Sequence, residues 1–291
     1  MLLLQIIVKT NKLFEMTSLS DFNKFTGDLK RQDNKMPVLF IGHGSPMNGI
    51  EHNQFSESWA KLAKEIPTPK AVLVVSAHWL SRGTKITAMD FPETIHDFGG
   101  FPKELFEVQY PAPGNPELAK ETASIIKSAE VELVHDWGLD HGAWTIIMNM
   151  YPDAKIPVLQ LSIDYTKGPQ FHYELAKELS SLRSKGVLIM GSGNMVHNLR
   201  MLSFDKLDEE FGFDWAIEMN ELFKKYIGNR NHQALINYES LCIAAKLAIP
   251  TPDHYFPLLY ALGLQGKNEE AFIFNDKLIA GSLTMTSLMI Q

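Results

Sequence analysis

The feature that most constrains this fold is a series of short runs made almost entirely of apolar residues. They are Val38 to Ile41, Ala71 to Val75, Pro157 to Ile163 and Val187 to Met190. Short apolar runs without a polar alternation are typical of strands that are covered on both faces, as in parallel sheets. We therefore predict that these runs are the central strands of one sheet.

Segments with apolar residues at helical spacing alternate with these runs. We expect helices at Phe55 to Glu65, Pro116 to Ala129, Gln170 to Ser184 and Asp214 to Tyr226, and long loops at Phe91 to Phe101 and Tyr110 to Pro116. Strands that alternate with amphipathic helices predict an α/β fold, with helices covering a mostly parallel sheet. Because α/β chains of 291 residues often fold as one unit, we expect a single domain.

The N-terminal stretch does not read as a targeting signal. Met1 to Val8 is apolar, but no basic residue precedes it and it meets Lys9 too early for a signal peptide. The stretch from Lys9 to Lys35 is polar and reads as an appended segment. No later run approaches the ~20 apolar residues of a membrane span. We expect a cytoplasmic protein without a membrane segment.

Charge and cysteine content exclude several classes of partner and site. A net charge of −7 gives no basic footprint for nucleic acid, so a small-molecule partner is favoured. Cys242 is the only cysteine, which excludes an internal disulfide and a thiolate zinc site. An imidazole-rich site with an open position remains, and imidazole suits zinc, iron, copper and nickel alike.

Three histidines follow predicted strands. His43 lies between two glycines directly after the first run, His78 lies just past the second, and His197 lies three residues beyond the turn expected at Gly191 to Asn194. Open parallel sheets bind ligands outside the carboxyl ends of their strands. We therefore expect these histidines to converge in one crevice and to bind a metal ion.

Two further histidines are candidates for the same crevice. His254 lies in Pro250 to Tyr255, where two prolines stiffen the chain, and is either a ligand or a loop histidine at a helix start. His141 lies in a glycine-bracketed loop and is either a ligand or a proton donor.

The other polar candidates are weaker. His96 and His135 read as structural or supporting residues, and we expect His52, His172 and His232 to be solvated. Ser45 and Ser192 offer hydroxyl nucleophiles, but their surroundings match neither a nucleophile elbow nor a dinucleotide fingerprint.

Eight motifs in order carry a family resemblance. They are HGSPMN (43–48), SAHW (76–79), TIHDFGGFP (94–102), YPAPG (110–114), DHGAW (140–144), QLSID (160–164), GSGNMVHNLR (191–200) and PTPDHY (250–255). Together they resemble the DOPA 4,5-dioxygenase family, a branch of the class III extradiol ring-cleavage dioxygenases. The match runs from Met36 to about Gly281, which implies a catalytic domain at 36–291 and an extension at 1–35.

The resemblance implies the roles of the histidines. It places one divalent ion on His43, His78 and His254, with His197 as a fourth ligand or as an acid/base. His141 would move protons or contact the substrate. Iron(II) is expected for activity and zinc is plausible in the same site. Extradiol enzymes usually pair two histidines with one carboxylate, whereas this chain has a histidine there, with Asp253 beside it.

The implied reaction is the insertion of O₂ into a catechol ring, of DOPA or a related compound, to give a ring-opened semialdehyde. A zinc hydrolase on the same histidines is the alternative, and a non-catalytic descendant of the fold is a third reading. Aromatic residues in the motifs would either line a pocket for the ring or pack the core; they are Trp79, Phe98, Phe101, Tyr110, Trp137, Trp144 and Tyr255.

Overall fold

The computed structural model describes residues 35–207 and 209–291, and most of their strands join one sheet. Its strands are β1 (Val38–Gly42), β2 (Ala71–Ser81), β3 (Thr84–Thr87), β4 (Val131–Val134), β5 (Val158–Asp164), β6 (Val187–Gly193), β7 (Ala271–Phe274) and β10 (Ser287–Ile290). Within the described ranges, these eight lie in the order β4-β3-β5-β2-β6-β1-β10-β7. The centre, β5-β2-β6-β1, is parallel, whereas β3 and β10 join it antiparallel. A separate antiparallel ribbon pairs β8 (Leu278–Ile279) with β9 (Leu283–Thr284).

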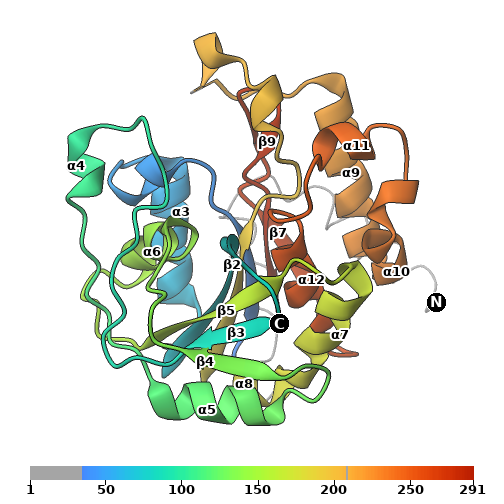
Figure 1. The fold of residues 1–291 in the computed structure, drawn as a ribbon. Helices are drawn as coiled ribbons and strands as arrows, with labels where there is room; N and C mark the ends of the chain where they lie inside the picture. Colours follow the sequence, from blue (N-terminus) through green and yellow to red (C-terminus); the bar gives the residue numbers. More distant parts are fainter. Residues whose placement is uncertain (1–34, 208) are drawn as a thin grey trace.

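Helices cover both faces of this sheet. The α-helices are α3 (Gln54–Glu65), α4 (Lys103–Phe106), α5 (Pro116–Ile125), α6 (His141–Met150), α7 (Pro169–Glu178), α8 (Ser180–Ser184), α9 (Asp214–Gly228), α10 (His232–Ile236), α11 (Ala245–Ala248) and α12 (Phe256–Gly263). Short 3₁₀ turns are η1 (Pro46–Gly49), η2 (Leu199–Met201), η3 (Phe204–Lys206) and η4 (Tyr238–Ser240). Figure 1 shows α3 and α6 on one side of the sheet and α7, α9 and α12 on the other. The predicted α/β fold, a mostly parallel sheet flanked by helices in one domain, is confirmed.

Alternate residues of the central strands point into two separate cores. In β1, Val38 and Phe40 pack into the core that contains the buried residues of α7, α9 and α12. Leu39 and Ile41 pack into the core under α3 and α6. Successive side chains of a strand point to opposite faces, so a strand with helices on both sides must be apolar throughout. This confirms the four predicted central strands.

Two predicted strand ends were wrong. β2 continues through His78 to Ser81, and β6 includes the Gly191–Gly193 segment that was predicted as a turn. The pairing of β2 with β6 ends where Ser76 meets Ser192, and the pairing of β2 with β5 shifts register between Val75 and Leu80. His78 therefore lies in an irregular part of a strand rather than beyond its end.

Two predicted helices were too long. α5 ends at Ile125, and the segment predicted as one helix from Gln170 to Ser184 is two helices, α7 and α8. The break lies at Leu179, whose backbone N–H donates to the carbonyl of Ala176, three residues earlier. A bond of that span tightens the helix and redirects the chain. The helices predicted at Phe55 to Glu65 and Asp214 to Tyr226 are confirmed.

Glycines in β6 allow α12 to lie directly on the sheet. A Cβ on Gly191 would lie 2.3 Å from the carbonyl oxygen of Pro257, and one on Gly193 would lie 2.2 Å from that of His254. Neither backbone oxygen can move aside as a flexible side chain could. The two glycines therefore set how closely the His254 segment approaches β6.

No helix in the described part of the chain combines the length and the apolar composition needed to cross a membrane. The predicted N-terminal extension covers residues 1–35. Of these, residues 1–34 lie outside the described residues, and only Lys35 is described.

The prediction that His172 is solvated was wrong. His172 is fully buried between α7 and α12, with its Nδ1 atom 3.0 Å from the Tyr260 hydroxyl. Burial lowers the pKa of His172 to about 4, although the charge of Asp164 acts in the opposite direction. His232 is half-buried and hydrogen-bonded to Tyr173 and Gln265, and only His52 is exposed as predicted.

The buried His172 predicts a loss of stability in acid. As pH falls below about 6.5 the unfolded chain protonates this histidine, whereas the folded chain keeps it neutral until pH reaches about 4. Its contribution is therefore present above pH 6.5 and is lost across that window. In His172→Phe, we expect the drop in unfolding free energy from pH 7 to pH 5 to shrink by on the order of 1–2 kcal/mol in urea denaturation. His52→Phe, at an exposed position, should keep the wild-type drop; equal drops in all three proteins would contradict the prediction.

The close approach of α12 to β6 predicts that a side chain at Gly191 lowers the stability of the fold. Gly191→Ala should lower the unfolding free energy by about 1–3 kcal/mol, because the added methyl group meets backbone atoms. Gly228→Ala is a matched control, since a Cβ there meets nothing within 4 Å at the end of a helix. Thermal or urea unfolding measures both variants, and a Gly191→Ala protein as stable as Gly228→Ala would show that the contact is not tight.

Candidate metal centre

The structure brings five of the predicted histidines together at the carboxyl end of the sheet. The ring centroid of His43 lies 5.0 Å from that of His78 and 5.3 Å from that of His254. The ring of His141 lies 3.8 Å from that of His78, and the ring of His197 lies 3.5 Å from that of His254. Residues more than 200 positions apart in sequence thus form one cluster.

His43 is positioned by the parallel pairing of β1 with β6. Its backbone N–H donates to the carbonyl of Gly193 at 3.2 Å, and its own carbonyl accepts from the Asn48 side chain at 2.9 Å. The side chain is 2% exposed. Both ends of the His43 peptide are therefore fixed where the strand stops.

His254 is held against β6 by the residue that follows the strand. The backbone N–H of Asn194 donates to the carbonyl of His254 at 2.9 Å, next to the close contact at Gly193. The next residue, Tyr255, is fully buried and donates its hydroxyl to the carbonyl of Leu235 at 2.8 Å. His254 therefore sits in an anchored turn immediately before α12.

His141 begins α6, whereas it was predicted in a loop. Asp140 is the N-cap, and its carboxylate accepts from the backbone N–H of Ala143 at 3.1 Å. The same buried carboxylate accepts from the Ser76 hydroxyl at 2.7 Å and from the Gln160 amide at 2.6 Å. Burial raises the pKa of Asp140 to about 6, and these hydrogen bonds oppose that rise. The network fixes the start of α6 against β2 and β5.

The hydrogen bonds of Ser192 fix the tautomer of His43. The single hydroxyl proton of Ser192 is donated to the carbonyl of Gly142 at 2.5 Å. Ser192 can therefore only accept at its 3.0 Å contact with Nδ1 of His43, so that Nδ1 carries the proton. The Nε2 atom of a neutral His43 then presents a free lone pair.

Carboxylates favour the same tautomer, with the proton on Nδ1, in two more rings. Nδ1 of His141 lies 3.0 Å from Asp97, and Nδ1 of His254 bonds Asp253. A carboxylate partner favours the tautomer with the proton on Nδ1. Burial tends to raise the pKa of Asp97, but hydrogen bonds from His141 and the charge of its ring outweigh burial and lower it.

Four rings of the cluster, those of His43, His78, His197 and His254, are held in their neutral form. Burial, followed by the repulsion of neighbouring imidazoles, lowers the pKa of His43 and of His254 well below the ordinary value. Burial also lowers the pKa of His78 to about 3 and that of His197 to about 4. Neutral imidazoles are the form that binds a metal ion.

The donor set fits a nitrogen-binding divalent ion. Nε2 of His43 and Nε2 of His78 face each other at 3.0 Å. The ligand atoms of His43, His78 and His141 lie within 4.8 Å of one another, and so do those of His197, Asp253 and His254. Lone pairs that converge in this way repel one another unless a proton or a cation lies between them.

His197 and His254 cannot both point at one ion as they stand. Their rings are stacked, with centroids 3.5 Å apart and planes inclined by 5°. The lone pair of an imidazole nitrogen lies in the plane of its ring, and one ion cannot lie in two parallel planes. This stacking favours the acid/base reading of His197 over the ligand reading.

Other predicted residues lie outside the cluster or support it. His96 bonds the carbonyl of Val108 at 3.0 Å in a structural role, and His135 is exposed. Ser192 serves as a hydrogen-bond partner, and Ser45 caps η1. Sequence reasoning missed Asp97, which directly follows His96 in a glycine-rich loop.

The aromatic residues of the motifs divide between core and site. Trp79 stacks on Trp137 with centroids 5.5 Å apart, while Tyr110, Trp144 and Tyr255 are buried core residues. The rings of Phe98 and His141 are nearly perpendicular, with centroids 5.6 Å apart, and Phe98 also packs on Phe101. Phe98 thus lies beside the histidine cluster.

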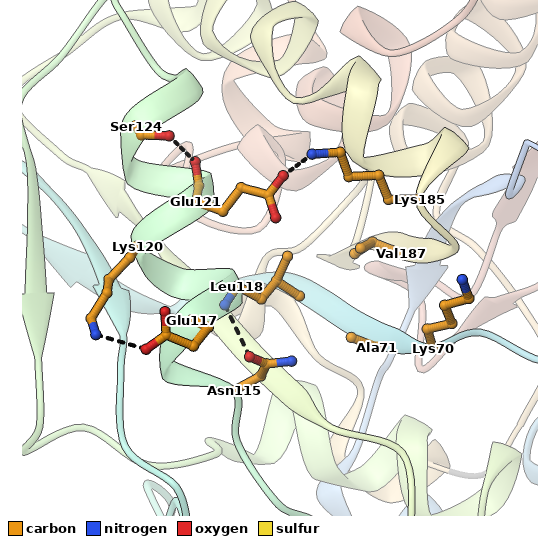
Figure 2. A pocket seen from close by; sticks show the side chains of 10 residues that line it. All are labelled: Lys70, Ala71, Asn115, Glu117, Leu118, Lys120, Glu121, Ser124, Lys185 and Val187. Atoms are coloured by element: carbon orange, nitrogen blue, oxygen red, sulfur yellow. Dashed lines mark hydrogen bonds and ion pairs between the residues drawn. The ribbon is translucent and has the colours of Figure 1, made fainter.

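A pocket of about 680 Å³ lies at the opposite end of the sheet, next to the first residues of β2 and β6 (Figure 2). Its lining combines surface residues of both charges, including the ion pair between Lys185 and Glu121, with the buried Ala71 and Val187. Ligands of open parallel sheets bind at the other end of the strands, so we give this pocket no part in the chemistry.

Known proteins are similar to this chain in sequence and in fold. Residues 37–285 match the family described as the catalytic LigB subunit of aromatic ring-opening dioxygenase. A 4,5-DOPA dioxygenase extradiol of Escherichia coli (strain K12) is 43% identical over 90% of this chain and 97% of its own length. One from Beta vulgaris is 35% identical over 88% of this chain and 97% of its own. A crystal structure of an uncharacterized Escherichia coli K12 protein is 40% identical, with a TM-score of 0.77, over 88% of this chain and 100% of its own.

These matches support the ring-opening dioxygenase reading, and they do not support the zinc hydrolase or the non-catalytic descendant. The resemblance drawn from the eight motifs is confirmed. The chain belongs to the family of the catalytic LigB subunit of aromatic ring-opening dioxygenases, and it is an extradiol enzyme of that family.

Proposed function

We propose that His43, His78 and His254 hold one divalent ion and that the enzyme opens the ring of a catechol. The observation that carries the proposal is the pair of Nε2 atoms of His43 and His78, which face each other at 3.0 Å. The Nδ1 proton of His43 is committed to Ser192, which leaves its Nε2 free for a metal. The ring of His254 lies within 5.3 Å of both other rings, measured between centroids.

The working ion is proposed to be iron(II), with zinc as an alternative occupant. A non-haem iron(II) ion at this position would bring catecholate and O₂ to one centre and pass electron density between them. The three proposed ligands are neutral, so they leave the full charge of the ion available to an anionic catecholate. Asp253 stays beside His254 as its Nδ1 partner, which supports a nitrogen ligand where related enzymes use a carboxylate.

The remaining two histidines, His197 and His141, are proposed to act as acid/base groups. His197 stacks on His254 and has a pKa lowered to about 4, so it is neutral and able to accept a proton from a catechol hydroxyl. The ring of His141 lies next to that of His78, and its Nδ1 atom is hydrogen-bonded to Asp97. Its Nε2 is free to accept or return a proton at the substrate ring.

The substrate is proposed to be DOPA or a related catechol, with O₂ as the second substrate. The relatives from Escherichia coli and Beta vulgaris are named for 4,5-DOPA. The ring of Phe98 beside His141 offers an apolar contact for a planar ring. The product would be a ring-opened semialdehyde that retains both oxygen atoms.

Metal analysis tests the proposed ligand set. Protein with His43→Ala, His78→Ala or His254→Ala should lose most of its bound metal, measured by plasma mass spectrometry after loading and gel filtration. His197→Ala should retain about one ion per chain and lose activity, because its ring is stacked rather than aimed at the ion. His135→Ala, at an exposed position, is the control for histidine removal. Metal loss from His197→Ala equal to that from His43→Ala would make His197 a ligand.

Oxygen uptake tests the reaction. Enzyme loaded anaerobically with iron(II) and then given DOPA and O₂ should consume one O₂ for each DOPA. Mass spectrometry with ¹⁸O₂ should find both labelled atoms in the product. The zinc-loaded enzyme should consume none, since zinc has no redox chemistry. Failure of the iron-loaded enzyme across a panel of catechols would refute the proposed function.

A further inference from the structure

One carboxylate, that of Asp97, joins a long loop to the histidine cluster. Its Oδ1 accepts from the backbone N–H of His141 at 2.9 Å, and its Oδ2 lies 3.0 Å from Nδ1 of the same residue. The Nδ1 atom of His78 lies 3.5 Å from that Oδ2. The Asp97 side chain is 17% exposed, so it is largely shielded from water.

The loop that carries Asp97 is fixed to the segment before α6. Leu139 donates its backbone N–H to the carbonyl of Glu93 and accepts from the backbone N–H of Ile95, both at 2.7 Å. The indole N–H of Trp144 donates to the carbonyl of Ile95 at 3.0 Å. The position of Asp97 relative to His141 is therefore set by backbone pairing on one side and by α6 on the other.

The two contacts of Asp97 with His141 have different consequences. The bond to the backbone N–H supports the first turn of α6, where a negative charge is also favoured by the helix dipole. The bond to Nδ1 sets the tautomer of the ring and leaves the Nε2 lone pair free. Only the second contact bears on proton transfer.

We infer that Asp97 is a positioning residue for ring cleavage, which holds His141 with its proton on Nδ1 and its Nε2 free to accept a proton from the substrate. This inference rests on the proposed function for the role of His141. In this role Asp97 acts through the ring of His141.

The substitution Asp97→Asn separates the two contacts. An asparagine has one acceptor oxygen, and the backbone N–H of His141 cannot give up its proton, so the oxygen should stay on that N–H. The asparagine amide then faces Nδ1 as a donor. Nδ1 of His141 can accept from this amide only if the ring carries its own proton on Nε2 instead. Nε2 can then no longer accept a proton from the substrate, whereas the hydrogen bond to the backbone N–H at the start of α6 is kept.

The tautomer is read directly by ¹⁵N nuclear magnetic resonance of histidine in the zinc-loaded protein, with the His141 signals assigned by their loss in His141→Asn. We expect Nδ1–H in the wild type and Nε2–H in Asp97→Asn. In the iron-loaded enzyme, kcat of Asp97→Asn should fall about 100-fold or more, with a much smaller change in KM. The double variant Asp97→Asn/His141→Asn should be about as slow as His141→Asn alone, because the two residues act as one unit.

Asp164→Asn is the matched control. Asp164 also accepts from a backbone N–H and a side chain, those of Thr166, but it lies outside the histidine cluster. It should keep the wild-type kcat and the His141 tautomer. Circular dichroism and metal content should match the wild type for both single variants.

Three outcomes would overturn the inference. They are an unchanged His141 tautomer in Asp97→Asn, a kcat within about twofold of the wild type, or a loss of bound metal, which would make Asp97 a support for His78 instead. An inactive wild type would refute the proposed function alone, because the resonance measurement does not depend on turnover.

Discussion

The contact between the end of β6 and the turn before α12 is the constraint on which the site depends. Gly193 leaves room for the carbonyl of His254, and Asn194 binds that carbonyl. The backbone N–H of His43 bonds the same strand end from the other side. A single strand terminus thus sets the distance between two histidines that are 211 positions apart, and any side chain at Gly193 would change it.

Around that terminus, hydrogen-bond partners contact the Nδ1 atoms of three of the five rings. Ser192 holds the Nδ1 proton of His43, Asp253 that of His254 and Asp97 that of His141. Burial keeps His43 and His254 neutral, so the cluster offers lone pairs rather than protons. The Nε2 atoms of His43 and His78 approach to 3.0 Å, a separation at which a proton or a cation must lie between their lone pairs. That arrangement is the physical link between this fold and metal-dependent oxygen chemistry.

The irregular end of β2 shows how the sheet makes space for the cluster. Regular pairing with β6 stops at Ser76, and the register with β5 shifts before Leu80. Irregularities of this kind re-aim side chains near active sites. His78 occupies the irregular stretch, where it faces His43 on one side and His141 on the other. Ser76 is bound to Asp140, the cap of α6, so the helix that carries His141 is tied to the same stretch.

The fold class, the central strands and the histidines that gather can be predicted from the sequence, because burial on both faces and parallel strand ends leave a direct pattern in the residues. Eight ordered motifs also determined the family. Contacts seen only in the folded chain show that Nδ1 of His43 faces Ser192, that His197 stacks on His254, and that Asp97 lies 3.0 Å from Nδ1 of His141. They also show that His172 is buried. These features depend on contacts between segments distant in sequence, and neither periodicity nor spacing along the chain carries that information.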